Sequence, residues 1–70
     1  MTTYRDRFAV GTRVVVCAPE SEGTDHEFNG RRGTIVKRGN YVAVDLDRPL
    51  KYWPNPAFIC LHNLRLESDQ

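Results

Sequence analysis

Short runs of hydrophobic residues, separated by turn-forming residues, recur along the whole chain. The clearest is 41–46, in which Val42, Val44 and Leu46 alternate with other residues and fall on one face of an extended strand. The other runs are rich in β-branched or alternating apolar residues, whereas helical periodicity is almost absent. The pattern predicts strands at 13–17, 34–38, 41–46, 57–60 and 64–66.

Turn signals fall between these runs. Gly39 and Asn40 separate two predicted strands, and both residue types tolerate a positive φ, which favours a tight hairpin. The link 61–63 is too short for a strand and fits one turn of 3-10 helix. Prolines, which cannot donate to a sheet ladder, lie outside the runs at Pro19, Pro49, Pro54 and Pro56.

Four or five short strands joined by turns predict an all-β fold, either a small barrel or a sandwich. With 70 residues the chain has room for one domain, which we place at 10–67 between a flexible N-terminal arm (1–9) and a C-terminal tail (68–70). One end of the core is expected to be closed by Phe28 or Phe58. The remaining core positions are expected to be Val14, Val16, Ile35, Val42, Val44, Leu46, Ile59, Leu64 and Leu66.

Composition narrows the class of protein. Charged residues make up 27% and hydrophobic residues 40%, as in ordinary globular proteins. No run approaches the ~20 apolar residues of a membrane span, and the N-terminus lacks the apolar stretch of a signal peptide. We therefore expect a cytoplasmic protein in which Cys17 and Cys60 are free thiols.

The net charge is only +1, but the charges are segregated. An acidic segment (18–30) precedes a basic one (31–38). The acidic segment is either a flexible, solvated loop or a receptor for a basic partner, through Glu20, Glu22, Asp25 and Glu27. Three interpretations of the basic segment are open: a solvated strand face that protects an edge, a set of charges neutralised by the acidic segment, or a phosphate-binding face with Tyr41 available for base stacking. Its basic residues are Arg31, Arg32, Lys37 and Arg38.

The proline-rich segment 49–56 carries Tyr52 and the single tryptophan, Trp53. Aromatic residues in a stiffened loop are good binding anchors, because they bring a large contact area at low entropic cost. The alternative is that Trp53 folds back and closes one end of the core.

Metal binding and catalysis have weaker signals. The potential metal ligands are Cys17, His26, Cys60 and His62. They do not show the paired spacing of structural zinc sites. Gly30 and Gly33 precede a strand instead of a helix, so they do not form a phosphate loop. The sequence therefore predicts neither an enzyme nor a cofactor.

Two stretches, VGTRVVV (10–16) and FNGRRGTIV (28–36), together with VAV (42–44) and NLRL (63–66), resemble the KOW motif. This motif belongs to Src-homology-3-like barrels of certain ribosomal proteins and transcription elongation factors. The resemblance covers 10–67 and implies a five-stranded Src-homology-3-like barrel with a 3-10 turn before the last strand. The long segment 18–27 departs from the short loop of KOW sequences and is similar to the long first loop of peptide-binding Src-homology-3 domains.

Two functional hypotheses follow. The favoured one is a non-enzymatic binding module that docks onto a protein partner or larger assembly through its acidic segment and its aromatic loop. The alternative is a KOW-like RNA- or DNA-binding protein that uses the basic strand face. The two differ in salt dependence, because phosphate contacts weaken steeply as salt rises.

Overall fold

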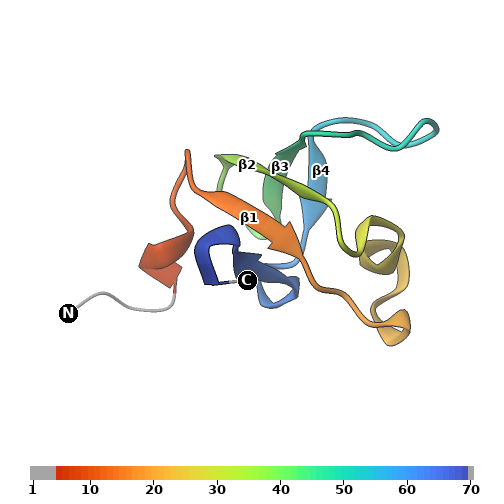
Figure 1. Cartoon of the computed structure of the whole chain (residues 1–70), viewed down its shortest axis with the longest axis horizontal. Helices are drawn as coiled ribbons and strands as arrows, with labels where there is room; N and C mark the ends of the chain where they lie inside the picture. Colours follow the sequence, from red (N-terminus) through yellow and green to blue (C-terminus); the bar gives the residue numbers. More distant parts are fainter. Residues whose placement is uncertain (1–4, 70) are drawn as a thin grey trace.

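Five strands form one antiparallel sheet in the computed structural model of the protein, which describes residues 5–69. They are β1 (Arg13–Val16), β2 (Arg32–Lys37), β3 (Val42–Leu46), β4 (Ala57–Ile59) and β5 (Leu64–Leu66). Their order in the sheet is β4-β3-β2-β1-β5, and the sheet is strongly curved (Figure 1). The all-β prediction is confirmed. β4 and β5 are the two edge strands, and within residues 5–69 they do not pair with each other, so the sheet is not closed.

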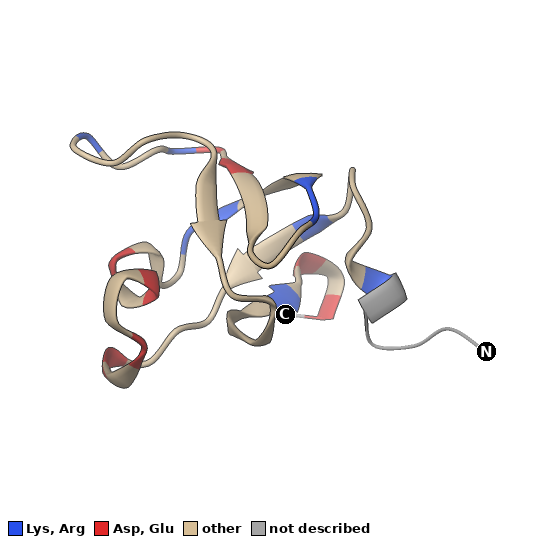
Figure 2. Cartoon of the chain, turned by 180° about the vertical axis from the view of Figure 1, so that it is seen from behind, with Lys and Arg blue, Asp and Glu red and all other residues tan. Residues whose placement is uncertain are grey.

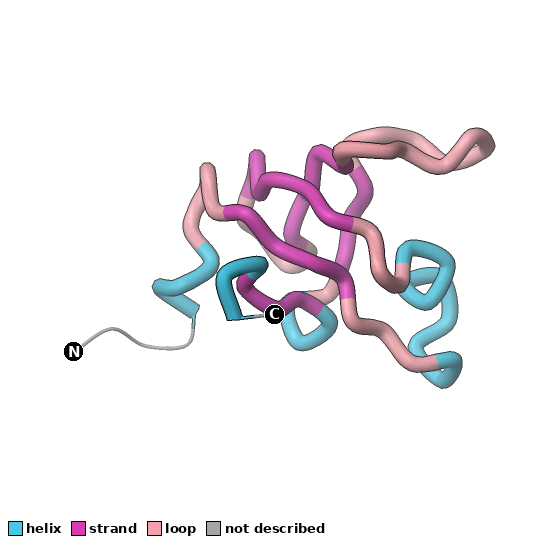
Figure 3. Tube along the Cα trace, in the orientation of Figure 1, coloured by secondary structure: helices cyan, strands magenta, loops and turns pink. Residues whose placement is uncertain are grey.

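The helical elements are short 3-10 turns, namely η1 (Arg5–Phe8), η2 (Glu20–Phe28), η3 (Leu61–Asn63) and η4 (Glu67–Asp69), shown in cyan in Figure 3. The 3-10 turn predicted before the last strand is confirmed as η3. By contrast, the segment predicted as a loop over 18–27 is mostly helical turns, interrupted by a kink at Gly23. None of the helices among residues 5–69 has the length and apolar character that crossing a membrane requires.

Alternation along the strands builds the core. In β3, Val42 pairs with Ile59 of β4 and Val44 pairs with Ile35 of β2, so apolar side chains of three strands share one face. The predicted core positions are buried, except that Leu66 is only half-buried at its edge. The core also contains three residues that the sequence did not predict, Phe8, Ala18 and Ala57, together with Phe28, one of the two predicted end-closing aromatics.

Phe58 is therefore not the residue that closes the core. It lies between Ala57 and Ile59, which both face inward, so the period of two turns Phe58 to the opposite face. Its side chain is 58% exposed, against 4% for Phe28.

Phe8 corrects the predicted domain boundary. It was assigned to the N-terminal arm, yet it is 2% exposed and belongs to the core cluster. The chain after it is held by backbone bonds, since the N–H of Gly11 donates to the carbonyl of Ile35 (2.7 Å) and that of Ile35 donates to Thr12 (3.0 Å). The folded unit thus begins at least as early as Phe8.

The two glycines of the KOW-like stretch have different roles. Gly30 has a φ of 85°, the left-handed region in which other residues are strained, and it leads the chain from η2 into β2. Gly33 lies inside β2, where a Cβ would stand 2.7 Å from Cγ1 of Val44 and closer still to the carbonyl oxygen of Asp45. Gly33 is therefore required by the close approach of β3.

The hairpin between β2 and β3 exists, but its predicted turn is wrong. The connection covers residues 38–41 instead of two, and a register shift between Ile35 and Lys37 marks a β-bulge. Gly39 does not take a positive φ, and no residue other than glycine does so among those described. The bulge adds a local kink and twist to β2 near its end.

Candidate binding site

Two of the four acidic residues predicted to contact a partner, Glu22 and Asp25, form hydrogen bonds within the protein instead. Asp25, only 6% exposed, accepts hydrogen bonds from the backbone N–H of Cys60 (3.0 Å) and from Nδ2 of Asn63 (2.7 Å). The same amide donates to Glu22 (2.9 Å), whose carboxylate also pairs with His62. Glu22 and Asp25 thereby fasten η2 to η3, whereas Glu20 and Glu27 remain exposed.

The network changes the proton affinity of its members. The hydrogen bonds from His62 and then Asn63 lower the pKa of Glu22 below its usual value, despite partial burial. Burial, followed by the negative charge of Asp25, raises the pKa of the Cys60 thiol. Cys60 is therefore protonated at neutral pH and is a poor nucleophile.

The two aromatic residues of the proline-rich loop have different environments. Tyr52 is 86% exposed, whereas Trp53 is 38% exposed and packs edge-on against Phe28, with ring centroids 5.5 Å apart. Trp53 therefore lies between the two predicted alternatives, since it contacts the core residue Phe28 and keeps 38% of its surface exposed. Figure 1 shows the loop projecting from the sheet beside η2.

The base of this loop is fixed on both sides. Asn55 accepts a hydrogen bond from the N–H of Leu46 (3.0 Å) and donates to the carboxylate of Asp45 (2.7 Å). Leu50 packs against the core, and its carbonyl accepts from the N–H of Trp53 (3.3 Å). Tyr52 is therefore presented at the tip of a loop that is anchored at its ends.

The basic strand face predicted over 31–38 is split. Arg31 and Arg32 stand at the start of β2, and Lys37 stands at its end, roughly 20 Å away at about 3.3 Å per residue. Arg38 is half-buried, and its guanidinium binds the carbonyl of Phe8. The guanidinium of Arg38 thus helps to hold the N-terminal segment in place. The four basic residues therefore do not form one surface.

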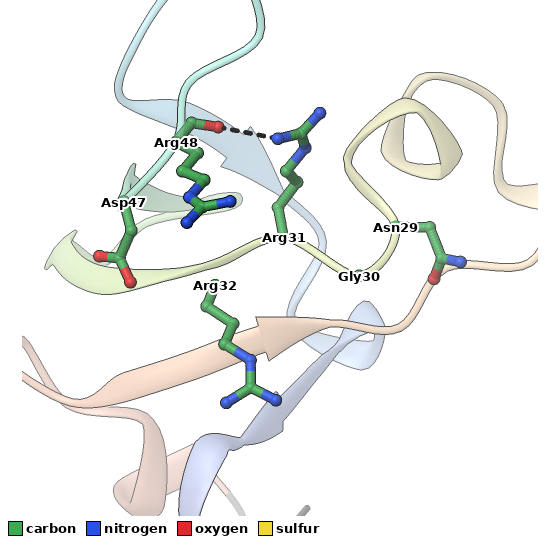
Figure 4. Close-up of a pocket in the computed structure, with 6 residues that line it drawn as sticks. All are labelled: Asn29, Gly30, Arg31, Arg32, Asp47 and Arg48. Atoms are coloured by element: carbon green, nitrogen blue, oxygen red, sulfur yellow. Dashed lines mark hydrogen bonds between the residues drawn. The ribbon is translucent and has the colours of Figure 1, made fainter.

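An arginine-lined cleft of about 610 Å³ opens at the start of β2 (Figure 4). We call it the arginine cleft; its lining comes from two segments and comprises Asn29, Gly30, Arg31, Arg32, Asp47 and Arg48. A bond from the backbone N–H of Asp47 to the carbonyl of Arg32 (2.9 Å) holds the segments together. Arg48 was not predicted, because only the pairing of β2 with β3 brings it beside Arg31.

The acid in this lining is already paired. Arg13 donates to both carboxylate oxygens of Asp47, one of them at 2.7 Å, and lowers the pKa of that carboxyl. Arg13 also binds Glu67 (3.0 Å), which lies 3.7 Å from Arg32. These groups are partly exposed, so the ion pairs contribute little to stability, but they offset the charge of Asp47.

A second, smaller groove of about 220 Å³ lies at the hairpin end of the sheet. Tyr41 and Phe58, 56% and 58% exposed, line it together with Lys37. Tyr41 was predicted as a stacking residue. Phe58 was missed as a surface residue, although the alternation of 57–59 carries the signal.

The four potential metal ligands do not form one site. His26 binds the carbonyl of Ala18 through Nδ1 (2.8 Å), and His62 pairs with Glu22. Cys17 and Cys60 are free thiols, as expected. Across residues 5–69, no three histidine, cysteine or acidic side chains are grouped so that they could hold a metal ion.

Comparison of the chain with protein-family models, with curated proteins and with solved structures found no match.

Proposed function

We propose that this chain is a small, non-enzymatic binding module that docks onto a protein partner through the loop 47–56. The observation that carries the proposal is the placement of Tyr52, which is 86% exposed at the tip of a loop whose ends are anchored by Asn55 and Leu50. A tyrosine ring held outward on a fixed base offers a partner a large contact area together with a polar hydroxyl group. Fixing the loop beforehand also reduces the entropy lost on binding.

The fold supports a binding role. The order β4-β3-β2-β1-β5 and the 3-10 turn before β5 are consistent with the Src-homology-3-like architecture that the KOW-like stretches suggest. We propose that architecture for the chain. In such small folds loops at the ends of strands carry the contacts, while the core is too small to enclose a substrate.

The aromatic loop, and not the acidic segment, is the centre of the proposed contact. Glu22 and Asp25 are occupied by Asn63, His62 and Cys60, so releasing them to a partner would break hydrogen bonds that are partly or, for Asp25 with Asn63, fully buried. Glu20 and Glu27 are free to contribute at the rim, where charges assist the encounter more than the final affinity.

Site-specific photo-crosslinking tests this proposal. A photoreactive phenylalanine analogue placed at position 52 is expected to crosslink a defined protein in a cell lysate treated with nuclease. The matched control carries the same analogue at position 41, where the tyrosine is also more than half exposed but lies at the hairpin end. Equal crosslinking from both positions, or none from position 52, contradicts the proposal.

One observation favours a second function. The groove at the hairpin end places two exposed aromatic rings, Tyr41 and Phe58, beside Lys37. This combination suits single-stranded nucleic acid, whose bases stack on aromatic rings while its phosphates meet a cation. A complex of this kind loses affinity steeply with rising salt, which separates it from aromatic docking.

A further inference from the structure

The arginine cleft has more positive charge than its neighbours neutralise. Three guanidinium groups line it, from Arg31, Arg32 and Arg48, against one carboxylate, that of Asp47. Asp47 is bound on both oxygens by Arg13, which stands outside the cleft. The cleft itself therefore retains a local excess of positive charge.

Most N–H donors of these guanidinium groups form no hydrogen bond with the described residues. Arg31 makes one bond, from Nη1 to the carbonyl of Arg48, and at 3.3 Å it is a long one. Arg32 approaches Glu67 only to 3.7 Å. Neither Arg31 nor Arg48 forms an ion pair with any group in the described part of the chain. In Figure 4 the side chains of Arg31 and Arg48 lie on the same side of the β2 backbone, whereas Arg32 points to the opposite side.

The planar guanidinium group is complementary in geometry to a carboxylate. Each planar guanidinium can bind both oxygens of one carboxylate in two parallel hydrogen bonds, which gives geometric selectivity as well as energy. Arg48 lies in the same loop as Tyr52, and the Nζ of Lys51 stands 5.3 Å from the Tyr52 ring centroid. Because Tyr52 follows Arg48 by four residues, at most about 14 Å of extended chain, one bound segment of a few residues can reach both.

The charge around the cleft disfavours a long polyanion. Acidic residues, red in Figure 2, are spread along η2, which ends directly before the first lining residue, and exposed Glu27 precedes that residue, Asn29, by two positions. Lys37 stands at the other end of β2, so there is no continuous track of cations from one to the other. A nucleic acid backbone, which carries a charge at every phosphate, needs such a track.

We propose that the arginine cleft binds the carboxylate side chains of an acidic segment of the protein partner. The inference rests on the proposed function and deepens it: Tyr52 anchors the partner, and Arg31, Arg32 and Arg48 select acidic residues beside the anchor. It reverses the sequence-based expectation of a basic partner, because two of the four acids expected to attract one, Glu22 and Asp25, are bonded internally.

Binding of labelled peptides to the full chain tests the inference. The probe is a fluorescein-labelled peptide of alternating glutamate and serine, and its control replaces every glutamate with glutamine. The cleft variant is Arg31→Gln/Arg48→Gln. The charge-matched control is Arg7→Gln/Lys37→Gln, which removes two exposed cations that do not line the cleft. A single-stranded oligothymidine of similar length tests for the alternative ligand.

We expect the glutamate peptide to bind with a Kd below about 1 mM and the cleft variant to weaken it roughly tenfold or more, while the charge-matched control stays within about twofold. Equal weakening by both variants, tighter binding of the oligothymidine, or no binding below about 1 mM overturns the inference.

The outcomes for the two proposals are separable. If Tyr52→Ala abolishes partner binding but the cleft variant does not, the docking proposal stands and the proposed binding of acidic side chains in the cleft is contradicted. If the cleft variant alone loses the peptide while Tyr52→Ala leaves partner binding intact, the cleft is a site and the loop is not the anchor.

Discussion

The side-chain amide of Asn63 donates to the buried carboxylate of Asp25 across 2.7 Å, joining the turn before β5 to the segment between β1 and β2. The same amide binds Glu22, and the carbonyl of Asn63 accepts from the N–H of Cys17 (2.7 Å). One residue, 2% exposed, thus holds together elements that are distant in the sequence, through both its side chain and its backbone carbonyl. The segment that seemed an open acidic loop is, for this reason, part of the framework.

Asn63→Ala is expected to destabilise the fold by about 2–4 kcal/mol, because it leaves the buried carboxylate of Asp25 without its amide donor. Urea denaturation at neutral pH measures the change. The control, Asn40→Ala, alters an exposed hairpin residue and is expected to change stability by less than about 0.5 kcal/mol. Equal stabilities of the two variants would mean that the network does not hold η2 in place.

The lowered pKa of Glu22 makes part of the stability depend on pH. Since its folded-state pKa lies below the unfolded value of about 4.3, its contribution is fully present above that pH and is lost as the pH falls through the folded-state pKa. Glu22→Gln should therefore destabilise the protein more at about pH 7 than at about pH 3. Glu20→Gln, at an exposed position, should show the same small effect at both. A Glu22→Gln penalty that does not shrink in acid contradicts this role.

Gly33→Ala is expected to cost about 1–3 kcal/mol, because the added methyl group collides with Val44 and with the backbone of Asp45. Gly39 is the matched control: a Cβ there meets only the carbonyl of Tyr41 at 3.6 Å, and φ is not positive. Gly39→Ala should be neutral or slightly stabilising by restricting the unfolded chain. Thermal unfolding distinguishes the two, and similar midpoints would show that β3 does not approach as closely as described.

Phe8→Ala should destabilise the domain by about 3–5 kcal/mol, the cost of removing a large aromatic side chain from a packed core. Val10→Ala, two residues on but 62% exposed, should have little effect. Denaturant unfolding of both variants tests whether the folded unit includes the N-terminal segment. If Phe8→Ala unfolds at the wild-type midpoint, Phe8 does not belong to the core.

The local patterns in the sequence predicted the elements well, because alternation and turn residues act over a few positions. Val42, Val44 and Leu46 were assigned to one face, and the turn at 61–63 was placed correctly. What the sequence could not provide was the register. The cleft between Arg31 and Arg48 depends on which residue of β2 pairs with which of β3.

Charged residues were the least reliable guide to the candidate site. The sequence does not indicate whether a carboxylate or a guanidinium is solvated or binds a residue that is distant along the chain. Glu22 and Asp25 find their partners about forty residues away along the chain, and Arg38 finds the carbonyl of Phe8 thirty residues before it. The adjacency of Arg31 to Lys37 in sequence likewise concealed their separation along an extended strand.

The most direct test of the docking proposal is the affinity of the crosslinked partner for the wild-type protein, Tyr52→Ala and Tyr41→Ala, measured at low and moderate salt after nuclease treatment. We predict that Tyr52→Ala weakens binding roughly tenfold or more, as expected for an exposed aromatic anchor, with Tyr41→Ala within about twofold of wild type. The opposite pattern, wild-type affinity for Tyr52→Ala with loss for Tyr41→Ala or on adding salt, contradicts the account and moves the site to the hairpin groove.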